Sequence, residues 1–203
     1  DLVVNNIDKV KPNGIATVTQ PTATVRGATI TIDATDDASG VSKIINPENG
    51  VTNGDHAEYV VTRPGTYRFI VWDVAGNSRE IQVPVTIISG GVTVKYVDYY
   101  NKNTTIAADT TISGNVEDAY YTNPKTVDGW TLFVIPDNKD GRHAIEPITV
   151  TYEYKKNTQV NVKHLDYYTH SNVADEETIT GVQNDSYTAQ SKDVEGYAYT
   201  GSE

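Results

Sequence analysis

Alternating apolar and polar side chains run through most of this chain, and one alternating heptapeptide occurs twice. Residues 94–100 read VKYVDYY and residues 162–168 read VKHLDYY, 68 positions apart. In the first copy Val94 and Tyr96 fall on one face and Lys95 falls on the other, and this period of two predicts a β-strand. The Asp-Tyr-Tyr that ends each copy predicts a loop after the strand.

The likeness between the copies continues downstream at an offset of 67 residues, which implies one residue lost in the loop. Three more blocks agree in order and spacing: Ile112-Ser113-Gly114 with Ile179-Thr180-Gly181, Asp118-Ala119-Tyr120 with Asp185-Ser186-Tyr187, and Val127-Asp128-Gly129-Trp130 with Val194-Glu195-Gly196-Tyr197. Agreement at four separated blocks indicates a tandem repeat.

The second copy ends early. It has no counterpart of the strand expected over Ile148–Lys155, which should pair with the first strand of the repeat. Without that partner, the strand over Val160–Leu165 would expose unpaired backbone groups. Either the natural chain continues past Glu203 or a neighbouring element covers the gap, and we expect continuation because the first repeat shows what the complete unit contains. A start at Asp1-Leu2-Val3-Val4 and the absence of Met also indicate a piece of a longer protein.

The first 89 residues show short alternating runs with turn residues between them. TITIDAT at residues 29–35 directs Ile30 and Ile32 to one face. Further strands are expected over residues 41–45, 57–62, 67–72 and 80–88. Short strands about 8–12 residues apart are typical of a β-sandwich. Residues 1–12, with Pro12 at their end, are expected to form a linker.

One motif in this region sharpens the fold prediction. Pro64-Gly65-Thr66-Tyr67-Arg68-Phe69 has the form of the immunoglobulin tyrosine corner, with Phe69 in the place of the core cysteine. Tyr67 and Phe69 should then be buried and Arg68 exposed, because strand side chains alternate. The stretch from Thr29 through Asn77, with DDASGV and WDVAGN, resembles the Ig-like domains of bacterial surface proteins. That resemblance implies a spacer domain.

Ser89-Gly90-Gly91 predicts a hinge into the repeats. From Val92 onward the pattern VTVKYVD…ISG…DAYYT…VDGWTL…ITVTYEYK resembles the MucBP (mucin-binding protein) repeat of Gram-positive cell-surface proteins. The resemblance implies a ubiquitin-like β-grasp fold and a role in adhesion. The single helix of that fold is expected to be short, because no segment between residues 104 and 130 has a strong helical period.

The expected fold class is therefore mainly β, in three parts. An Ig-like β-sandwich over residues 1–89 is followed, in a linear array, by MucBP-type β-grasp repeats over residues 90–156 and, truncated, over residues 157–203. By resemblance, the chain should be extracellular, at the cell surface, and anchored to the cell wall in the full-length protein. We expect it to act as a monomer.

Composition excludes several classes of function. The net charge of −11 argues against nucleic acid as a partner, because phosphate binding needs clustered Lys and Arg. The absence of Cys excludes disulfides, thiolate metal sites and cysteine nucleophiles. No apolar run reaches the roughly 18 residues of a membrane span, so no membrane insertion is expected.

No catalytic or metal motif stands out, and we expect neither enzyme activity nor a cofactor. The four histidines share no metal-ligand spacing, and His164 takes the place of Tyr96 on the repeated strand, where packing explains it. Calcium is the alternative left open. It would bind where acidic turns converge at one end of the sandwich, on Asp8, Asp36, Asp37, Asp73 and Asn77. The same side chains also suit tight turns.

Tyrosine is unevenly distributed: of 14 tyrosines, only Tyr59 and Tyr67 precede the repeats. Planar rings on loops can stack on sugar faces while the hydroxyl bonds sugar oxygens. The candidate ligand-binding residues are therefore Tyr99, Tyr100, Tyr167 and Tyr168. A structural interpretation competes with this one, because tyrosine also favours strands, as expected for Tyr152 and Tyr154.

Two functions remain open on this basis. The first is adhesion to a glycan or mucin-like glycoprotein, which the family resemblance implies. The second is a structural stalk whose repeats hold a distal head away from the cell wall without binding a ligand.

Overall fold

The computed structural model describes residues 7–201, and all of its regular structure is β. Residues 1–6 and 202–203 lie outside the described residues, and the predicted start at Asp1-Leu2-Val3-Val4 and the position of Glu203 fall there. The chain divides into two compact units. The first unit runs to residue 93 and includes residues 111–121 and 140–149; the second has residues 94–110 and 122–139 and continues from residue 150.

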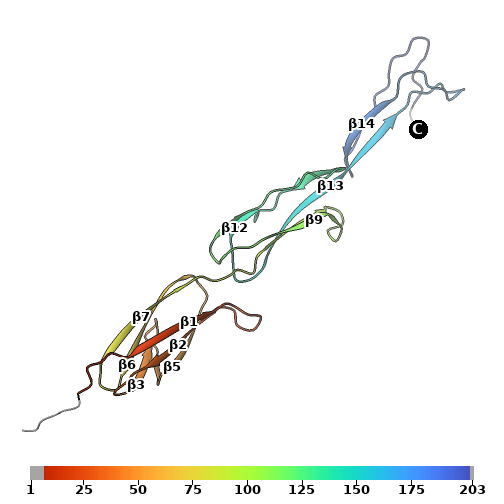
Figure 1. The fold of residues 1–203 in the computed structure, drawn as a ribbon. Helices are drawn as coiled ribbons and strands as arrows, with labels where there is room; N and C mark the ends of the chain where they lie inside the picture. Colours follow the sequence, from red (N-terminus) through yellow and green to blue (C-terminus); the bar gives the residue numbers. More distant parts are fainter. Residues whose placement is uncertain (1–6, 202–203) are drawn as a thin grey trace, which may run out of the picture. The chain divides into compact units, whose positions relative to one another are not determined.

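Two antiparallel sheets make up most of the first unit (Figure 1). One has the order β1-β2-β5, formed by Asn13–Thr19, Ala28–Thr35 and His56–Val61. The other has the order β4-β3-β6-β7, formed by Val51–Asn53, Val41–Ile45, Gly65–Asp73 and Ser78–Val85. Inward side chains of both sheets form one core, with Ile30, Ile32, Phe69 and Val71 fully buried. The predicted sandwich is confirmed.

The tyrosine corner is present. The Tyr67 hydroxyl donates to the backbone carbonyl of Arg63 at 2.7 Å, as in immunoglobulin domains. Phe69 is 0 % exposed, and Tyr59 packs edge-on against it with ring centroids 6.0 Å apart. Arg68 is exposed, as expected. Tyr67 is only half-buried, because its hydroxyl has to reach a carbonyl at the surface.

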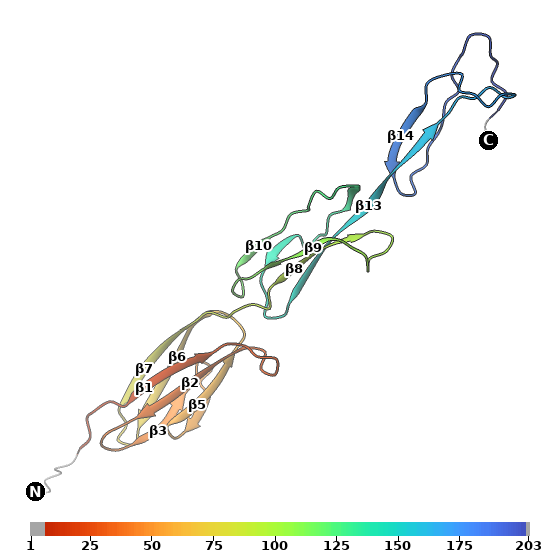
Figure 2. The ribbon, with the colours of Figure 1, turned by 45° about the vertical axis from the view of Figure 1, so that its right-hand side comes forward.

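The start of the sandwich differs from the expected linker. Strand β1 pairs with β2 along its whole length, from Asn13↔Thr35 to Thr19↔Thr29 (Figure 2). Pro12 is fully buried, and its carbonyl accepts a hydrogen bond from Arg79 Nε at 2.6 Å. The last residues of the predicted linker are therefore part of the domain.

The residues of the predicted hinge make hydrogen bonds within the first unit. The Ser89 and Gly90 amides donate to the carbonyls of Gly114 and Ala144, each at 3.0 Å. The Gly91 amide donates to Ser89 Oγ at 3.1 Å. A Cβ on Gly90 would lie 2.5 Å from the backbone nitrogen of Pro147, so glycine is needed here for close packing.

The segment expected to hold a short helix is extended instead. Strand β10 (Ala119–Tyr121) pairs with β12 (Asp140–Arg142) in a two-stranded sheet of the first unit. Throughout residues 7–201 the structure contains no helix, and therefore none long and apolar enough to cross a membrane. The mainly β class is confirmed, and the short helix is the detail that was wrong.

The second unit is built on a sheet with the order β11-β13-β8-β9. Its strands are Trp130–Val134, Ile148–Val162, Val92–Asp98 and Thr105–Ile112. The Ile148 amide donates to Gly91 O at the start of the two strands, and the Tyr99 amide donates to Tyr154 O further along both. Strands β8 and β13 therefore run in the same direction and are parallel. Parallel pairing of the first and last strands of a repeat is the β-grasp arrangement.

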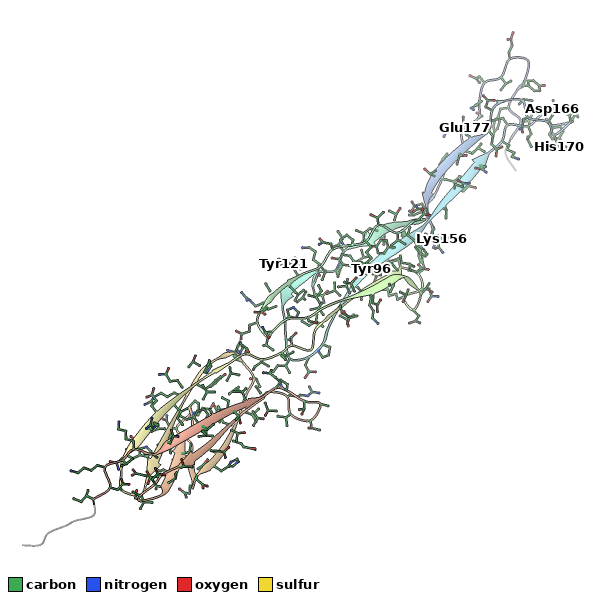
Figure 3. All side chains as sticks on the ribbon, in the orientation of Figure 1. Tyr96, Tyr121, Lys156, Asp166, His170 and Glu177 are labelled. Atoms are coloured by element: carbon green, nitrogen blue, oxygen red, sulfur yellow. The ribbon has the colours of Figure 1, made fainter. Side chains whose placement is uncertain are left out.

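Strand β13 runs without a break through the predicted repeat boundary at residue 156. Its first half pairs with β11, ending at Trp130↔Lys156. Its second half pairs with β14 (Glu177–Val182), beginning at Asn157↔Val182. Figure 3 shows Lys156 at this change of partner, with Glu177 at the far end of β14.

The two repeats share their turns. Asp98 and Asp166 each accept a bond from the amide two residues on, at 2.9 and 3.0 Å. Glu117 and Asn184 both have positive φ, at 73° and 65°. Gly129 and Gly196 do so as well, at 75° and 82°. The tandem repeat found in the sequence is therefore a repeat of local structure.

The second copy lacks a core in the part of the chain described. Between residues 157 and 201 no side chain is buried, whereas the first copy buries Val94, Tyr96 and Tyr152. Among the described residues, nothing pairs with residues 158–162 on the edge opposite β14. That edge corresponds to the one that β8 offers to β13 in the first copy.

Removing the Phe69 ring should destabilise the sandwich. Phe69→Ala is expected to cost about 3–5 kcal/mol in the free energy of unfolding, because it empties a packed aromatic site. Arg68→Ala, on the exposed face of the same strand, should cost under about 1 kcal/mol. Urea denaturation monitored by Trp72 fluorescence measures both. A loss below about 1 kcal/mol for Phe69→Ala would contradict the assigned core.

A strand supplied to the open edge of residues 158–162 should protect the second repeat. A variant with a second copy of residues 137–155 appended after Glu203 is expected to slow amide exchange over residues 158–165, because the appended strand can pair with the open edge. The control appends the same segment with polar residues in place of the copies of Val150, Tyr152 and Tyr154. Equal exchange in both variants and in the parent chain would show that this edge does not take such a strand.

Candidate functional site

The predicted tyrosine pairs follow Asp98 and Asp166, each of which accepts a hydrogen bond from the amide of the second tyrosine of its pair. In each pair the rings meet edge to face, with centroids 5.1 Å apart for Tyr99–Tyr100 and 5.2 Å apart for Tyr167–Tyr168. The turn therefore fixes two aromatic rings at nearly a right angle in both repeats. The surroundings of the two pairs differ.

In the first repeat the pair is part of a larger aromatic cluster, which we define as Tyr99, Tyr100, Phe133 and Lys155. Phe133 of β11 packs edge-on against Tyr99, with centroids 4.6 Å apart. Lys155 Nζ lies 3.9 Å from the centre of the Phe133 ring and within 5.9 Å of both tyrosine rings. The Lys155 side chain is only 12 % exposed, so the ammonium group holds the three rings together through cation–π attraction.

The cluster still presents aromatic surface to solvent. Tyr100 is 43 % exposed and Phe133 is 48 % exposed, while Tyr99 is half-buried beneath them. Lys102 lies over Tyr99 at 5.9 Å and pairs with Glu153 at 2.8 Å. The hydrogen bond to Glu153 raises the pKa of Lys102.

The second pair has fewer neighbours. Tyr167 and Tyr168 are 69 % and 87 % exposed. At the offset of the repeat, the counterpart of Phe133 is Thr200, which supplies no ring. The preceding Asp166 binds the Thr169 amide and hydroxyl, and these bonds lower the pKa of its carboxyl. Figure 3 shows Asp166 and His170 in this loop.

Such a cluster is suited to binding by stacking. Fixed, half-exposed aromatic rings offer flat apolar faces at low entropic cost, and phenol hydroxyls add hydrogen bonds. The sequence identified the two tyrosines but not Phe133 or Lys155. Both were visible as outward positions on alternating strands, but only the register of β11 against β13 brings them to the tyrosines. Whether Tyr99, Tyr100, Tyr167 and Tyr168 bind a ligand stays a prediction.

The carboxylates considered for calcium come together only in part. Oxygens of Asp8, Asp36 and Asp73 all lie within 4.8 Å of one another, and Asp37 is not in this group. Asn77 joins it by donating to Asp73 Oδ2 at 2.7 Å. The sequence suggested all five residues as one candidate site. The structure brings together three of the carboxylates and Asn77, without Asp37.

Turn hydrogen bonds account for most of these oxygens. Asp36 Oδ2 accepts from the amides of Ser39 and Gly40 at 2.8 and 2.9 Å. The Ser39 hydroxyl donates to Asp8 at 2.6 Å, which lowers the pKa of the Asp8 carboxyl. Asp36 Oδ1 is buried and has no partner among the described residues. Calcium binding at this cluster stays a prediction beside the turn interpretation.

The histidines do not form a site in the described part of the chain. His143 is buried with its Nδ1 3.0 Å from Ser89 Oγ, and His56 Nδ1 lies 2.7 Å from Asp33. His164 is half-buried two residues beyond the end of β13, and its Nε2 is buried without a partner among the described residues, so the packing role expected for it on a strand stays a prediction. Within residues 7–201, no histidine joins a group able to hold a metal ion.

With this geometry in place, comparison with known proteins identifies the repeats. The profile of the MucBP domain matches residues 91–155 and again residues 159–203, which together make up more than half of the chain. The chain belongs to the MucBP domain family. Both MucBP repeats were recognised from the strand, turn and glycine blocks of the sequence.

Relatives come from Listeria monocytogenes. Internalin J of strain F2365 is 41 % identical over 112 residues, which are 53 % of this chain and 12 % of that protein. Internalin I of the same strain is 32 % identical over 118 residues, 55 % of this chain and 6 % of that protein. The chain thus spans only a small part of these relatives. The prediction of a Gram-positive surface protein with MucBP repeats is confirmed.

Asp36 tests the two interpretations of the carboxylate cluster. Asp36→Ala should lower the stability of the sandwich by about 1–3 kcal/mol in chelator-treated buffer, because the amides of Ser39 and Gly40 lose their acceptor. Asp37→Ala is the matched control. Thermal melts with added Ca²⁺ complete the test: a site filled at ten times its Kd would add about 1.4 kcal/mol to the parent chain and nothing to Asp36→Ala. If the melting temperature does not change with Ca²⁺, the cluster serves only to stabilise the turn.

Proposed function

We propose that this chain is an adhesion module that binds glycan on a mucin-type glycoprotein, with the aromatic cluster of the first MucBP repeat as the contact surface. The Ig-like domain serves as a spacer, and the full-length protein is anchored to the cell wall. The module acts by binding and carries out no catalysis.

The observation that carries the proposal is the exposed aromatic surface of Tyr100 and Phe133, held in place by Lys155. Rings that serve only packing are covered, as Tyr152 and Tyr154 are in the same sheet. Rings fixed at an angle but left open suit the apolar faces of sugar rings. Membership of the MucBP family supports a glycoprotein as the partner.

The second candidate is a structural stalk. The unbroken strand β13, which joins the two repeats, favours it, because a shared strand is an effective way to stiffen a tandem array. The two functions are compatible in one protein. In an adhesion module the exposed rings contact a ligand, whereas in a stalk they contribute only to the fold.

Replacing the tyrosine pair should weaken binding without unfolding the repeat. We expect Tyr99→Ala combined with Tyr100→Ala to reduce the affinity of the 203-residue chain for immobilised mucin-type glycoprotein at least about fivefold, measured by surface plasmon resonance. Tyr121→Ala is the matched control, since Tyr121 is 74 % exposed on β10, outside the cluster. The double variant Tyr167→Ala with Tyr168→Ala measures how much the second tyrosine pair contributes to the affinity. Absence of saturable binding by the parent chain would favour the stalk.

A further inference from the structure

A polar groove opens where β13 changes partner from β11 to β14. It has a volume of about 470 Å³, and its polar lining comes from Thr131, Asn157, Thr158, Gln159 and Thr180. None of the residues that line it is charged. In a protein with a net charge of −11, a neutral surface made of hydroxyl and carboxamide groups is a distinctive local composition.

Most of the hydrogen-bonding capacity of this groove is unused. Thr131 Oγ1 donates to Asn157 Oδ1 at 2.6 Å, which fixes the carboxamide and leaves its Nδ2 free among the described residues. Gln159 and Thr180 are cross-strand partners, and both are exposed. Within residues 7–201 neither side chain has a hydrogen-bond partner. The groove therefore offers donors and acceptors that have no partner among the described residues.

The groove continues into the aromatic cluster. Lys155, Asn157 and Gln159 alternate on one face of β13, and Thr131 of β11 lies opposite Lys155. Phe133 lies at the register shift of β11, with its ring centre 3.9 Å from Lys155 Nζ. Two contacts hold the end of β14 beside the rings: the Tyr100 hydroxyl donates to Gln183 O at 3.3 Å, and Lys155 lies 3.8 Å from Asp185. Rings and groove thus form one surface.

We infer that this groove is a second binding subsite that takes the neutral hydroxyl-rich part of an oligosaccharide whose neighbouring sugar stacks on the aromatic cluster. Sugars without charge are bound by carboxamides and hydroxyls that match their own donors and acceptors, beside aromatic faces that take their C–H surfaces. An anionic sugar finds no cation in the groove, since Lys155 is already held by three rings and Asp185. This inference rests on the proposed function.

The location of the subsite has a direct consequence. Thr131 and Asn157 belong to the first repeat and its last strand, whereas Thr180 belongs to the second repeat. The complete surface exists only where two consecutive repeats meet. The binding unit is then the junction between repeats, and a single repeat supplies only the aromatic half.

The test uses the full 203-residue chain and an uncharged probe, lacto-N-neotetraose, with its sialylated form for comparison. In NMR titrations we expect amide shifts around residues 157–159 and 180–182 as well as at Tyr99 and Tyr100. Gln159→Ala combined with Thr180→Ala should weaken binding of the neutral probe roughly tenfold, the effect of losing two hydrogen bonds. Gln190→Ala, an exposed glutamine of the second repeat, is the control and should change nothing.

The outcomes separate this inference from the proposed function. If the Tyr99/Tyr100 double variant loses binding while the Gln159/Thr180 double variant keeps it, the proposed function stands and the groove subsite is wrong. If the sialylated probe binds while the neutral one does not, the ligand class is wrong. If neither probe shifts the groove amides although the glycoprotein binds, the inference is also overturned. Unchanged spectra of the free variants would show that the exposed substitutions leave the fold intact.

Discussion

The second unit depends on the burial of two tyrosines, Tyr152 and Tyr154, on the central strand β13. A buried phenol has to find a hydrogen-bond partner, because leaving it unpaired costs about as much as the burial gains. Tyr152 meets Thr122 Oγ1 at 2.9 Å, and the Tyr154 hydroxyl bonds both the carbonyl and the amide of Lys125. These bonds tie an extended segment across the sheet. The segment that they tie, residues 122–125, has no regular structure and lies in the region where the family resemblance implied a helix.

Strand periodicity was enough to predict most of the fold. Ile30 and Ile32, with Phe69 opposite, marked the sandwich core, and the first heptapeptide marked strand β8. The second heptapeptide begins only at the last residue of β13, so the strand expected through Leu165 ends at Val162. Strand β1 was missed because its inward residues Ala16 and Val18 are small and give a weak apolar signal. At Gly90 the sequence could not show whether a glycine serves flexibility or close approach. Only the neighbouring Pro147 backbone distinguishes them.

The candidate site was predictable to the same extent and for the same reason. Tyr99 and Tyr100 are local to one turn, so their pairing could be inferred from the Asp-Tyr-Tyr motif. Phe133 and Lys155 reach them only through strand register, which depends on contacts distant in sequence. Charge gave no guidance, because the lysines near the rings are matched by Glu153 and Asp185.

Because β13 is unbroken, even-numbered residues lie on the same face of the strand in both repeats. Even-numbered residues form the less exposed row of β13 from Val150 through Tyr154 and again at Val160 and Val162, so both repeats follow the same alternation along a single strand. An insertion of one residue near Lys156 would reverse that alternation and turn the less exposed row of the second repeat to solvent, whereas an insertion of two would preserve it. Where a flexible linker tolerates any change of length, this junction admits only even ones.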